Sequence, residues 1–94
     1  MDAIGLLKKN EAVVRERFGV ASIGVFGSFA RGEGTDASDV DVLVDFQPGK
    51  KTFDNFMDLK FFLEDLFGRD VDLVTEQALK PRIKDSILKS VVYA

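Results

Sequence analysis

The sequence predicts an α/β fold of the α+β kind, in which helices pack on a small mixed β-sheet of about three strands. Short apolar segments rich in β-branched residues alternate along the chain with longer segments whose apolar residues recur at helical spacing. The chain has 94 residues, the length of one domain, and an apolar fraction of 46%, ample for one hydrophobic core. Residues 1–94 are therefore expected to form a single domain.

The first third of the chain predicts a helix, a strand and a loop. Apolar side chains fall on one helical face over residues 2–18, and Gly19 ends that pattern. Residues 22–26 are apolar and bounded by glycines, which indicates a strand. A turn or two of helix is expected at residues 27–31, followed by a loop over residues 32–38, which are rich in Gly, Thr, Asp and Ser.

The middle of the chain predicts a second strand and the longest helix. Residues 39–46 alternate and then become continuously apolar, so they are expected to form a strand. Thr52 is a suitable N-cap for a helix over residues 53–67, which Gly68 closes.

Two adjacent phenylalanines in this helix leave two interpretations open. The side chains of Phe61 and Phe62 point about 100° apart, so both cannot face the centre of one core. Either one of them marks a contact surface, or the helix has a wide buried face.

The C-terminal third predicts a third strand and a final helix. The strand is expected over residues 70–75 and the helix over residues 79–91, with Pro81 in the first turn, where proline is tolerated. Residues 92–94 are expected to fray or to extend the chain.

The composition excludes several classes of chemistry. The chain has no cysteine and no histidine, which excludes disulfides, thiolate metal sites, Ser-His-Asp triads and the usual zinc sites. Any reaction must draw on carboxylates, hydroxyls, Lys and Arg, with or without a hard metal ion.

The charge and hydropathy patterns limit the kinds of partner and the cellular location that can be expected. The net charge of −3 and a pI near 4.8 argue against direct binding to nucleic acid. No apolar run approaches the roughly 20 residues that cross a bilayer, and the N-terminus lacks the pattern of a signal peptide. The expected location is the cytoplasm, without contact to a membrane.

Two aspartates at the start of the second predicted strand suggest a metal site. Residues two apart on a strand point to the same face, so the carboxylates of Asp39 and Asp41 are expected side by side. Two like charges at that distance repel unless a cation lies between them. Mg²⁺ is the ion that one or two carboxylates, water and phosphate oxygens satisfy best.

A third carboxylate is expected from the third strand. Asp72 interrupts an apolar run, and a charge in a short buried strand is costly unless it is paired or bound to metal. If the second and third strands are neighbours, Asp72 reaches the same cluster. Asp70 competes for this role, but it lies at the mouth of the strand beside Arg69.

The turn between the first strand and the short helix is suited to an anion. Gly27 lets backbone N–H groups approach a phosphate closely, and Ser28 adds a hydroxyl donor. Together they are expected to cradle the outer phosphates of a triphosphate. Arg31 is expected to pair with a nearby aspartate or, alternatively, to contact phosphate.

The order and spacing of these elements resemble a known superfamily. Gly27-Ser28, ten residues and then Asp39-Val40-Asp41 match the signature of the DNA polymerase beta-like nucleotidyltransferases. The run from Gly27 is similar to that of its minimal branch, the MNT domains, and Val71-Asp72-Leu73-Val74 resembles that branch's third-carboxylate strand. The similarity extends from Ile23 to the C-terminal helix. It implies a minimal nucleotidyltransferase domain with the polymerase beta-like fold.

The resemblance also implies roles for the residues. A hydroxyl attacks the α-phosphorus of ATP and pyrophosphate leaves, with two Mg²⁺ ions held by Asp39, Asp41 and Asp72. Asp72 would also orient or deprotonate the acceptor. Gly27 and Ser28 would bind the β- and γ-phosphates. Asp45 faces the same way but lies too far along the strand and is expected to be structural.

Members of the minimal branch typically occur beside a HEPN-domain ribonuclease, so the resemblance implies an antitoxin of a HEPN/MNT pair that adenylylates a tyrosine of its toxin. Two alternatives stay open. One is a non-catalytic subunit that neutralises or scaffolds its partner by contact alone. The other is the nucleotide-binding subunit of a two-protein enzyme that modifies a small molecule.

Overall fold

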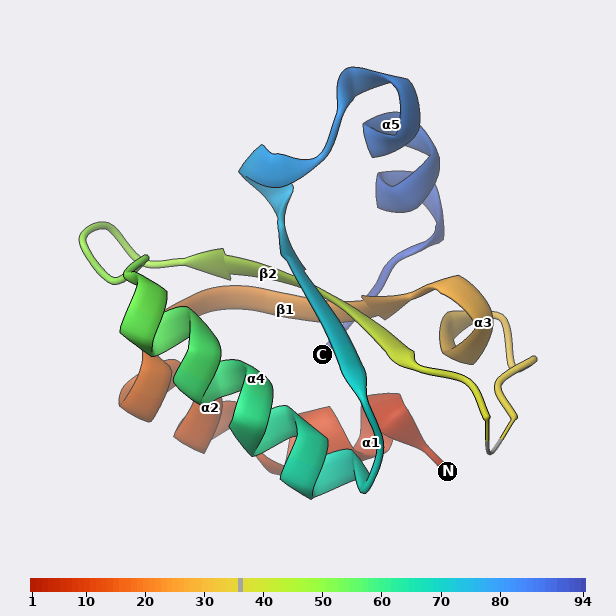
Figure 1. Cartoon of the computed structure of the whole chain (residues 1–94), viewed down its shortest axis with the longest axis horizontal. Helices are drawn as coiled ribbons and strands as arrows, with labels where there is room; N and C mark the ends of the chain where they lie inside the picture. The colour runs from red at the N-terminus through yellow and green to blue at the C-terminus, as the bar shows by residue number, and fades with distance from the viewer. Residues whose placement is uncertain (36) are drawn as a thin grey trace.

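A mixed sheet lies at the centre of the computed structural model, which describes residues 1–35 and 37–94 (Figure 1). Within these residues the strand order is β3-β2-β1-β4; β1 runs antiparallel to β2 and β4, and β2 runs parallel to β3. The strands are β1 (Val20–Phe26), β2 (Val40–Phe46), β3 (Val71–Thr75) and β4 (Val92–Tyr93), and the helices are α1 (Ala3–Lys9), α2 (Glu11–Phe18), α3 (Gly27–Ala30), α4 (Phe53–Phe67), η1 (Glu76–Ala78, a short 3₁₀ helix) and α5 (Pro81–Ser90). The predicted fold class is confirmed.

The helices divide between the two sides of this sheet. Figure 1 shows α1, α2 and α4 together on one side of the strands and α5 on the other. Residue 36, within the predicted loop, lies outside the described residues.

The N-terminal segment forms two helices rather than the predicted single one. Asn10 separates them: its side-chain Nδ2 donates to the carbonyl of Leu6 (2.9 Å), and its backbone N–H donates to the carbonyl of Leu7 (3.1 Å). This local bonding closes α1, and the carbonyl of Asn10 then accepts from Val14 to start α2. Both helices bury apolar residues, so the predicted apolar face is correct although the helix is interrupted.

The predicted ends of the longest helix are confirmed. Thr52 caps α4 through its Oγ1, which accepts from the backbone N–H of Asn55 at 3.1 Å. Gly68 ends it in the left-handed conformation, with φ of 66°, and Gly19 ends α2 in the same way. Pro81 is the first residue of α5, as expected.

The hydrophobic core lies between one face of the sheet and the three helices on that side. It comprises Ala3, Leu7, Val14, Phe18, Val20, Ile23, Val25, Val40, Val42, Val44, Phe46, Leu59, Leu63, Phe67, Val71 and Leu73. Phe62 packs against this core, with its ring centroid 5.3 Å from that of Phe18, whereas Phe61 is 53% exposed. The two side chains therefore differ, with Phe62 partly buried against the core and Phe61 exposed, so the helix does not bury both.

The C-terminal residues form a fourth strand, which corrects the prediction of about three. β4 pairs with the middle of β1, and the backbone N–H of Ala94 donates to the carbonyl of Ile23 at 2.9 Å. Gly24 permits this approach, because a Cβ added there would lie 2.8 Å from the carbonyl oxygen of Val92. The end of the chain therefore closes one edge of the sheet.

Candidate active site

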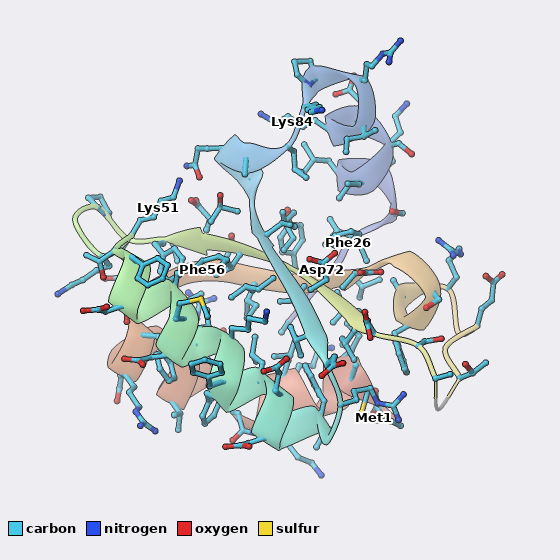
Figure 2. The ribbon with its side chains drawn as sticks, in the orientation of Figure 1. Met1, Phe26, Lys51, Phe56, Asp72 and Lys84 are labelled. Carbon is cyan, nitrogen blue, oxygen red and sulfur yellow. The ribbon has the colours of Figure 1, made fainter. Side chains whose placement is uncertain are left out.

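The face of the sheet opposite the core carries a row of carboxylates. In β2 the valines at 40, 42 and 44 are buried, so Asp41 between them points away from the core. Asp41 is the register partner of Asp72 on β3 and of Phe26 on β1. Asp72 and Phe26, both labelled in Figure 2, therefore flank Asp41 on the neighbouring strands. Asp41 and Asp72 therefore lie next to each other, as predicted.

The electrostatics of Asp41 reflect these neighbours. Its pKa is raised by partial burial first, then by the charges of Asp72 and Asp39, and the positive charge of Arg31 opposes these effects. Asp39 directly precedes β2 and is exposed. A cation at this row would relieve the repulsion among the carboxylates.

The donor set fits a magnesium ion in its chemistry. All three groups are carboxylates, the oxygen ligands that Mg²⁺ prefers in proteins. Over residues 1–35 and 37–94, no three acidic side chains converge closely enough to form a complete metal-binding group. Asp41 and Asp72 thus lie side by side, with Asp39 near enough to influence Asp41, but the three do not form a closed set of ligands.

Asp72 lies inside β3 and Asp70 precedes the strand, as predicted, but the expected cost of burying the charge of Asp72 is wrong. β3 is an edge strand of the sheet and Asp72 is exposed on it, so burial does not penalise its charge. Asp70 lies outside β3, and its carbonyl accepts from the backbone N–H of Val40 at 3.1 Å. Unlike Asp72, Asp70 is not among the groups that shift the pKa of Asp41. Register with Asp41, rather than burial, favours Asp72.

Gly27 lies directly against the carboxylate of Asp41. Its φ is +70°, a conformation that side chains disfavour, and a Cβ added there would lie 2.2 Å from Asp41 Oδ2. The position requires glycine both for its backbone conformation and for the space that the carboxylate occupies. The turn after β1 and the aspartate of β2 therefore form one site.

Replacing Gly27 with Ala is expected to damage both stability and nucleotide binding. The left-handed conformation alone costs about 1–2 kcal/mol for a residue with a Cβ, and the carboxylate of Asp41 must also move. Gly32→Ala is a matched control, since Gly32 has φ of +74° but an added Cβ meets nothing within 4 Å.

Urea unfolding and calorimetric titration of ATP with Mg²⁺ measure the two effects. We expect Gly27→Ala to be destabilised by about 1 kcal/mol more than Gly32→Ala, and to lose nucleotide affinity about tenfold while the control keeps it. Equal effects of the two substitutions would contradict the contact with Asp41.

The residues after Gly27 form a short helix and a tight turn. The carbonyl of Ser28 accepts from the backbone N–H of Glu33 at 2.8 Å. Arg31 Nε lies 3.0 Å from Glu33 Oε2 in an exposed ion pair. Among the described residues, the ion pair of Arg31 is thus with a glutamate and not with the expected aspartate, although the charge of Arg31 also lowers the pKa of Asp41.

Arg69 is a positioning residue that the sequence interpretation missed. Its Nη1 donates to the carbonyl of Thr35 at 2.8 Å, and its guanidinium lies 5.0 Å from the centroid of the Phe29 ring. Gly34 packs on the same ring, where an added Cβ would lie 2.5 Å from Phe29. Arg69 therefore links Phe29 of α3 and Thr35 to the segment before β3. No local signal marks this contact, because Thr35 and Arg69 are 34 residues apart.

The raised pKa of Asp41 predicts a specific dependence of stability on pH. The folded state binds the Asp41 proton more tightly than the unfolded state does, so the stability that this group contributes falls as pH rises from the unfolded pKa through the folded one. Asp41→Asn removes this penalty. Because the side chain is partly exposed, we expect the variant to be more stable at pH 7 by less than about 1 kcal/mol.

Urea unfolding across pH, without metal, measures this effect. The advantage of Asp41→Asn should disappear below about pH 4, near the ordinary pKa of aspartic acid. A variant that is less stable than the wild type at pH 7 would contradict the repulsion.

An open cavity of about 740 Å³ lies at the other end of β1 and does not include the aspartates of this row. Its lining includes Phe18, Gly19, Lys50 and Asn55, together with basic and acidic side chains of α2 and α4. The Nδ2 of Asn55 donates to the carbonyls of Phe18 and Lys50, which joins the loop after β2 to the end of α2. The residues around this cavity therefore hold the loop after β2 against α2, which is a structural role.

None of the helices in the described part of the chain has the length and apolar character needed to traverse a bilayer.

Comparisons with known proteins agree with the geometry. The nucleotidyltransferase domain family matches residues 7–94. The protein adenylyltransferase MntA of Thermococcus cleftensis is 47% identical over 88 residues, which cover 94% of this chain and 88% of that protein.

Two solved structures share the fold. A minimal nucleotidyltransferase superposes with a TM-score of 0.80 at 40% identity, over 98% of this chain and 95% of that one. A toxin–antitoxin structure with AMP-PNP superposes with a TM-score of 0.68 at 22% identity, over 98% and 68% of the two chains. The mixed sheet with its helices is thus the polymerase beta-like nucleotidyltransferase fold. This chain belongs to the nucleotidyltransferase domain family, and within it to the minimal nucleotidyltransferases related to the protein adenylyltransferase MntA.

Proposed function

We propose that this chain transfers AMP from ATP to a tyrosine of a HEPN-domain toxin, and so acts as its antitoxin. The observation that carries the proposal is the contact of the Asp41 carboxylate with Gly27, beside Asp72. It joins the carboxylates of β2 and β3 to the glycine turn whose backbone N–H groups we propose as donors to phosphate. Kinship with a protein adenylyltransferase supports the same reaction.

The proposed reaction exchanges one phosphoryl bond for another. The tyrosine oxygen forms a bond to the α-phosphorus of ATP, the bond from that phosphorus to the bridging oxygen breaks, and pyrophosphate leaves. Mg²⁺ ions, when bound, neutralise charge on the phosphates and on the attacking and leaving oxygens.

The proposal assigns a role to each residue of the site. Asp39 and Asp41 hold the metal, and Asp72 helps to hold a second ion and orients the acceptor hydroxyl or takes its proton. Gly27 and Ser28 bind the β- and γ-phosphates. Arg31, exposed at the end of α3, supplies positive charge to the outer phosphates when it leaves Glu33.

The nucleotide and the partner are carried over from relatives. AMP-PNP, an analogue of ATP, is bound in the related toxin–antitoxin structure, which supports ATP as the donor. The same structure is a complex of an antitoxin with its toxin, which supports a partner of that kind. A HEPN-domain protein is the partner that the minimal branch implies.

Intact-mass spectrometry of the HEPN-domain protein encoded beside this chain tests the proposal. After incubation with the wild type, ATP and Mg²⁺, we expect the mass of one or more AMP groups on a tyrosine. With Asp41→Asn the complex should form without the added mass.

Two results would support other functions. Toxin neutralised equally well by the unmodifying Asp41→Asn variant would favour a subunit that acts by contact alone. AMP found on a small molecule, with the partner unmodified, would favour the two-protein enzyme. The first result would overturn neutralisation through AMP transfer, and the second would overturn the tyrosine as the acceptor.

The choice between Asp72 and Asp70 gives a prediction of its own. Asp72→Asn is expected to lower the transfer rate about 100-fold, the usual size of a lost acid–base or ligand role. Asp70→Asn should lower it less than about threefold, because its side chain lies outside β3 and does not influence Asp41. Rates measured with saturating ATP compare them, and the reverse order would assign the role to Asp70.

A further inference from the structure

Helix α5 presents side chains that the rest of the molecule does not cover. It lies on the opposite side of the sheet from α1, α2 and α4 (Figure 1), and none of its residues is buried. Ile83 is 48% exposed, while Ile87 and Leu88 are half-buried. A helix with an apolar side normally buries that side against its own domain. In α5 only part of the apolar side is covered by the rest of the domain.

The exposed arc of α5 is basic as well as apolar. Arg82, Ile83, Ser86 and Lys89 are all exposed, and at 100° per residue they fall within one third of the helix circumference. We call these four residues the α5 surface. Ser86 lies at the centre of this surface, and its small side chain lets another protein approach the helix closely.

The charge of this segment is opposite to that of the remaining chain. Residues 79–91 contain four basic residues and one acidic residue, a net charge of +3. Since the whole chain carries −3, all other residues together carry −6. Charge complementarity therefore selects a partner with acidic groups around an apolar centre.

The position of α5 relates it to the reaction. It contacts α3, the helix that begins with Gly27 and Ser28. Lys84 of α5 lies 3.8 Å from Glu76, which joins the helix to the end of β3. A protein seated on α5 would therefore lie next to the phosphate turn and the carboxylate row.

We propose that the α5 surface is where the acceptor protein docks, through an apolar patch rimmed by acidic side chains. The proposal rests on the proposed function and specifies how that function reaches its substrate. A second copy of this chain fits less well, because the usual two-fold contact would place one basic helix against another. A nucleic acid fits less well too, because Asp41, Asp45 and Asp72 line the adjacent face of the sheet.

Kinetics of AMP transfer to the neighbouring HEPN-domain protein test the surface. Ile83→Asp is expected to raise the KM for that protein at least tenfold, the effect of losing an interface hot spot, with kcat and the affinity for ATP and Mg²⁺ unchanged. Phe61→Asp is the matched control: Phe61 is 53% exposed, but on α4, across the sheet from α5. It should leave the KM within about twofold.

A charge reversal keeps the test independent of the apolar substitution. Arg82→Glu should raise the KM about threefold to tenfold and weaken its dependence on salt, since one attractive charge becomes repulsive. Circular dichroism and thermal unfolding should be unchanged in both α5 variants, because neither residue is buried.

The remaining outcomes overturn the surface in distinguishable ways. Wild-type protein that transfers no AMP would overturn the proposed function and the docking surface with it. Transfer with an equal KM for Ile83→Asp and Phe61→Asp would overturn the surface alone. Three other results would also overturn the surface alone. Sedimentation could show a wild-type dimer that Ile83→Asp dissociates, or Ile83→Asp could lose affinity for ATP. Alternatively, the wild type could bind an RNA oligonucleotide, with Arg82→Glu abolishing that binding and leaving the KM for the protein unchanged.

Discussion

Asp41→Asn is expected to lower kcat/KM for nucleotidyl transfer about a thousandfold. The substitution keeps the shape of the side chain but removes the charge at the centre of the carboxylate row, against Gly27 and beside Asp72. Metal-held charge is worth several kcal/mol to a phosphoryl-transfer transition state, and each 1.36 kcal/mol is tenfold in rate. Release of pyrophosphate in the presence of the acceptor protein measures the loss.

Asp45→Asn is the matched control for this prediction. Asp45 lies on the same strand and the same face, but it is the register partner of Ser22, and its Oδ1 lies 3.5 Å from Gln77 Nε2. We expect kcat/KM to stay within about threefold of the wild type. Similar losses for both substitutions would mean that the general charge of the sheet face, and not the site at Gly27, drives the reaction.

Leu59→Ala is expected to destabilise the protein by about 3 kcal/mol. Leu59 is fully buried in the middle of α4, and truncation of a buried leucine removes transfer free energy and leaves a cavity. A domain of this size has a thin margin of stability. The melting temperature should therefore fall by more than about ten degrees, at 4–8 °C per kcal/mol.

Phe61→Ala tests whether burial, rather than helix content, causes that loss. Phe61 lies two residues further along the same helix and is 53% exposed. Its truncation is expected to change the unfolding free energy by less than about 0.5 kcal/mol, as at most surface positions. Thermal and urea unfolding compare the two variants, and a larger loss at Phe61 would contradict the packing described for α4.

Local signals were sufficient to predict most elements of the fold. The bounds of α4 are those predicted, because Thr52 and Gly68 are chemical start and stop signals that act within a few residues. The same reasoning placed Pro81 in the first turn of α5. Fold class follows from such elements once their apolar faces must meet in one core.

Features that depend on distant residues were not predictable in this way. β4 forms because Gly24, about 70 residues earlier, leaves room for the backbone of Val92. The exposure of Asp72 depends on the order of strands, which leaves β3 at the edge. The break at Asn10 is local, but a helical face continuing on both sides of it concealed the break.

The candidate site likewise combines features that local signals predict with features that depend on distant residues. Spacing alone indicated that Gly27 begins a turn directly after a strand. The carboxylate of Asp41 lies against Gly27 because of the antiparallel register of β1 and β2, which spacing along the chain does not reveal. The contribution of Arg69, which holds Phe29 and Thr35 near that turn, likewise required the three-dimensional arrangement.

The central claim is that the Gly27 turn and the carboxylate of Asp41 form one site for a triphosphate with its metal. Calorimetric titration of ATP into the wild type and into Asp41→Asn, each with and without Mg²⁺, tests it most directly. We predict binding that requires Mg²⁺ in the wild type and is lost in the variant, which unfolding measurements at pH 7 should show to be folded and at least as stable. Equal binding by both proteins, or binding that is indifferent to Mg²⁺, would contradict the site.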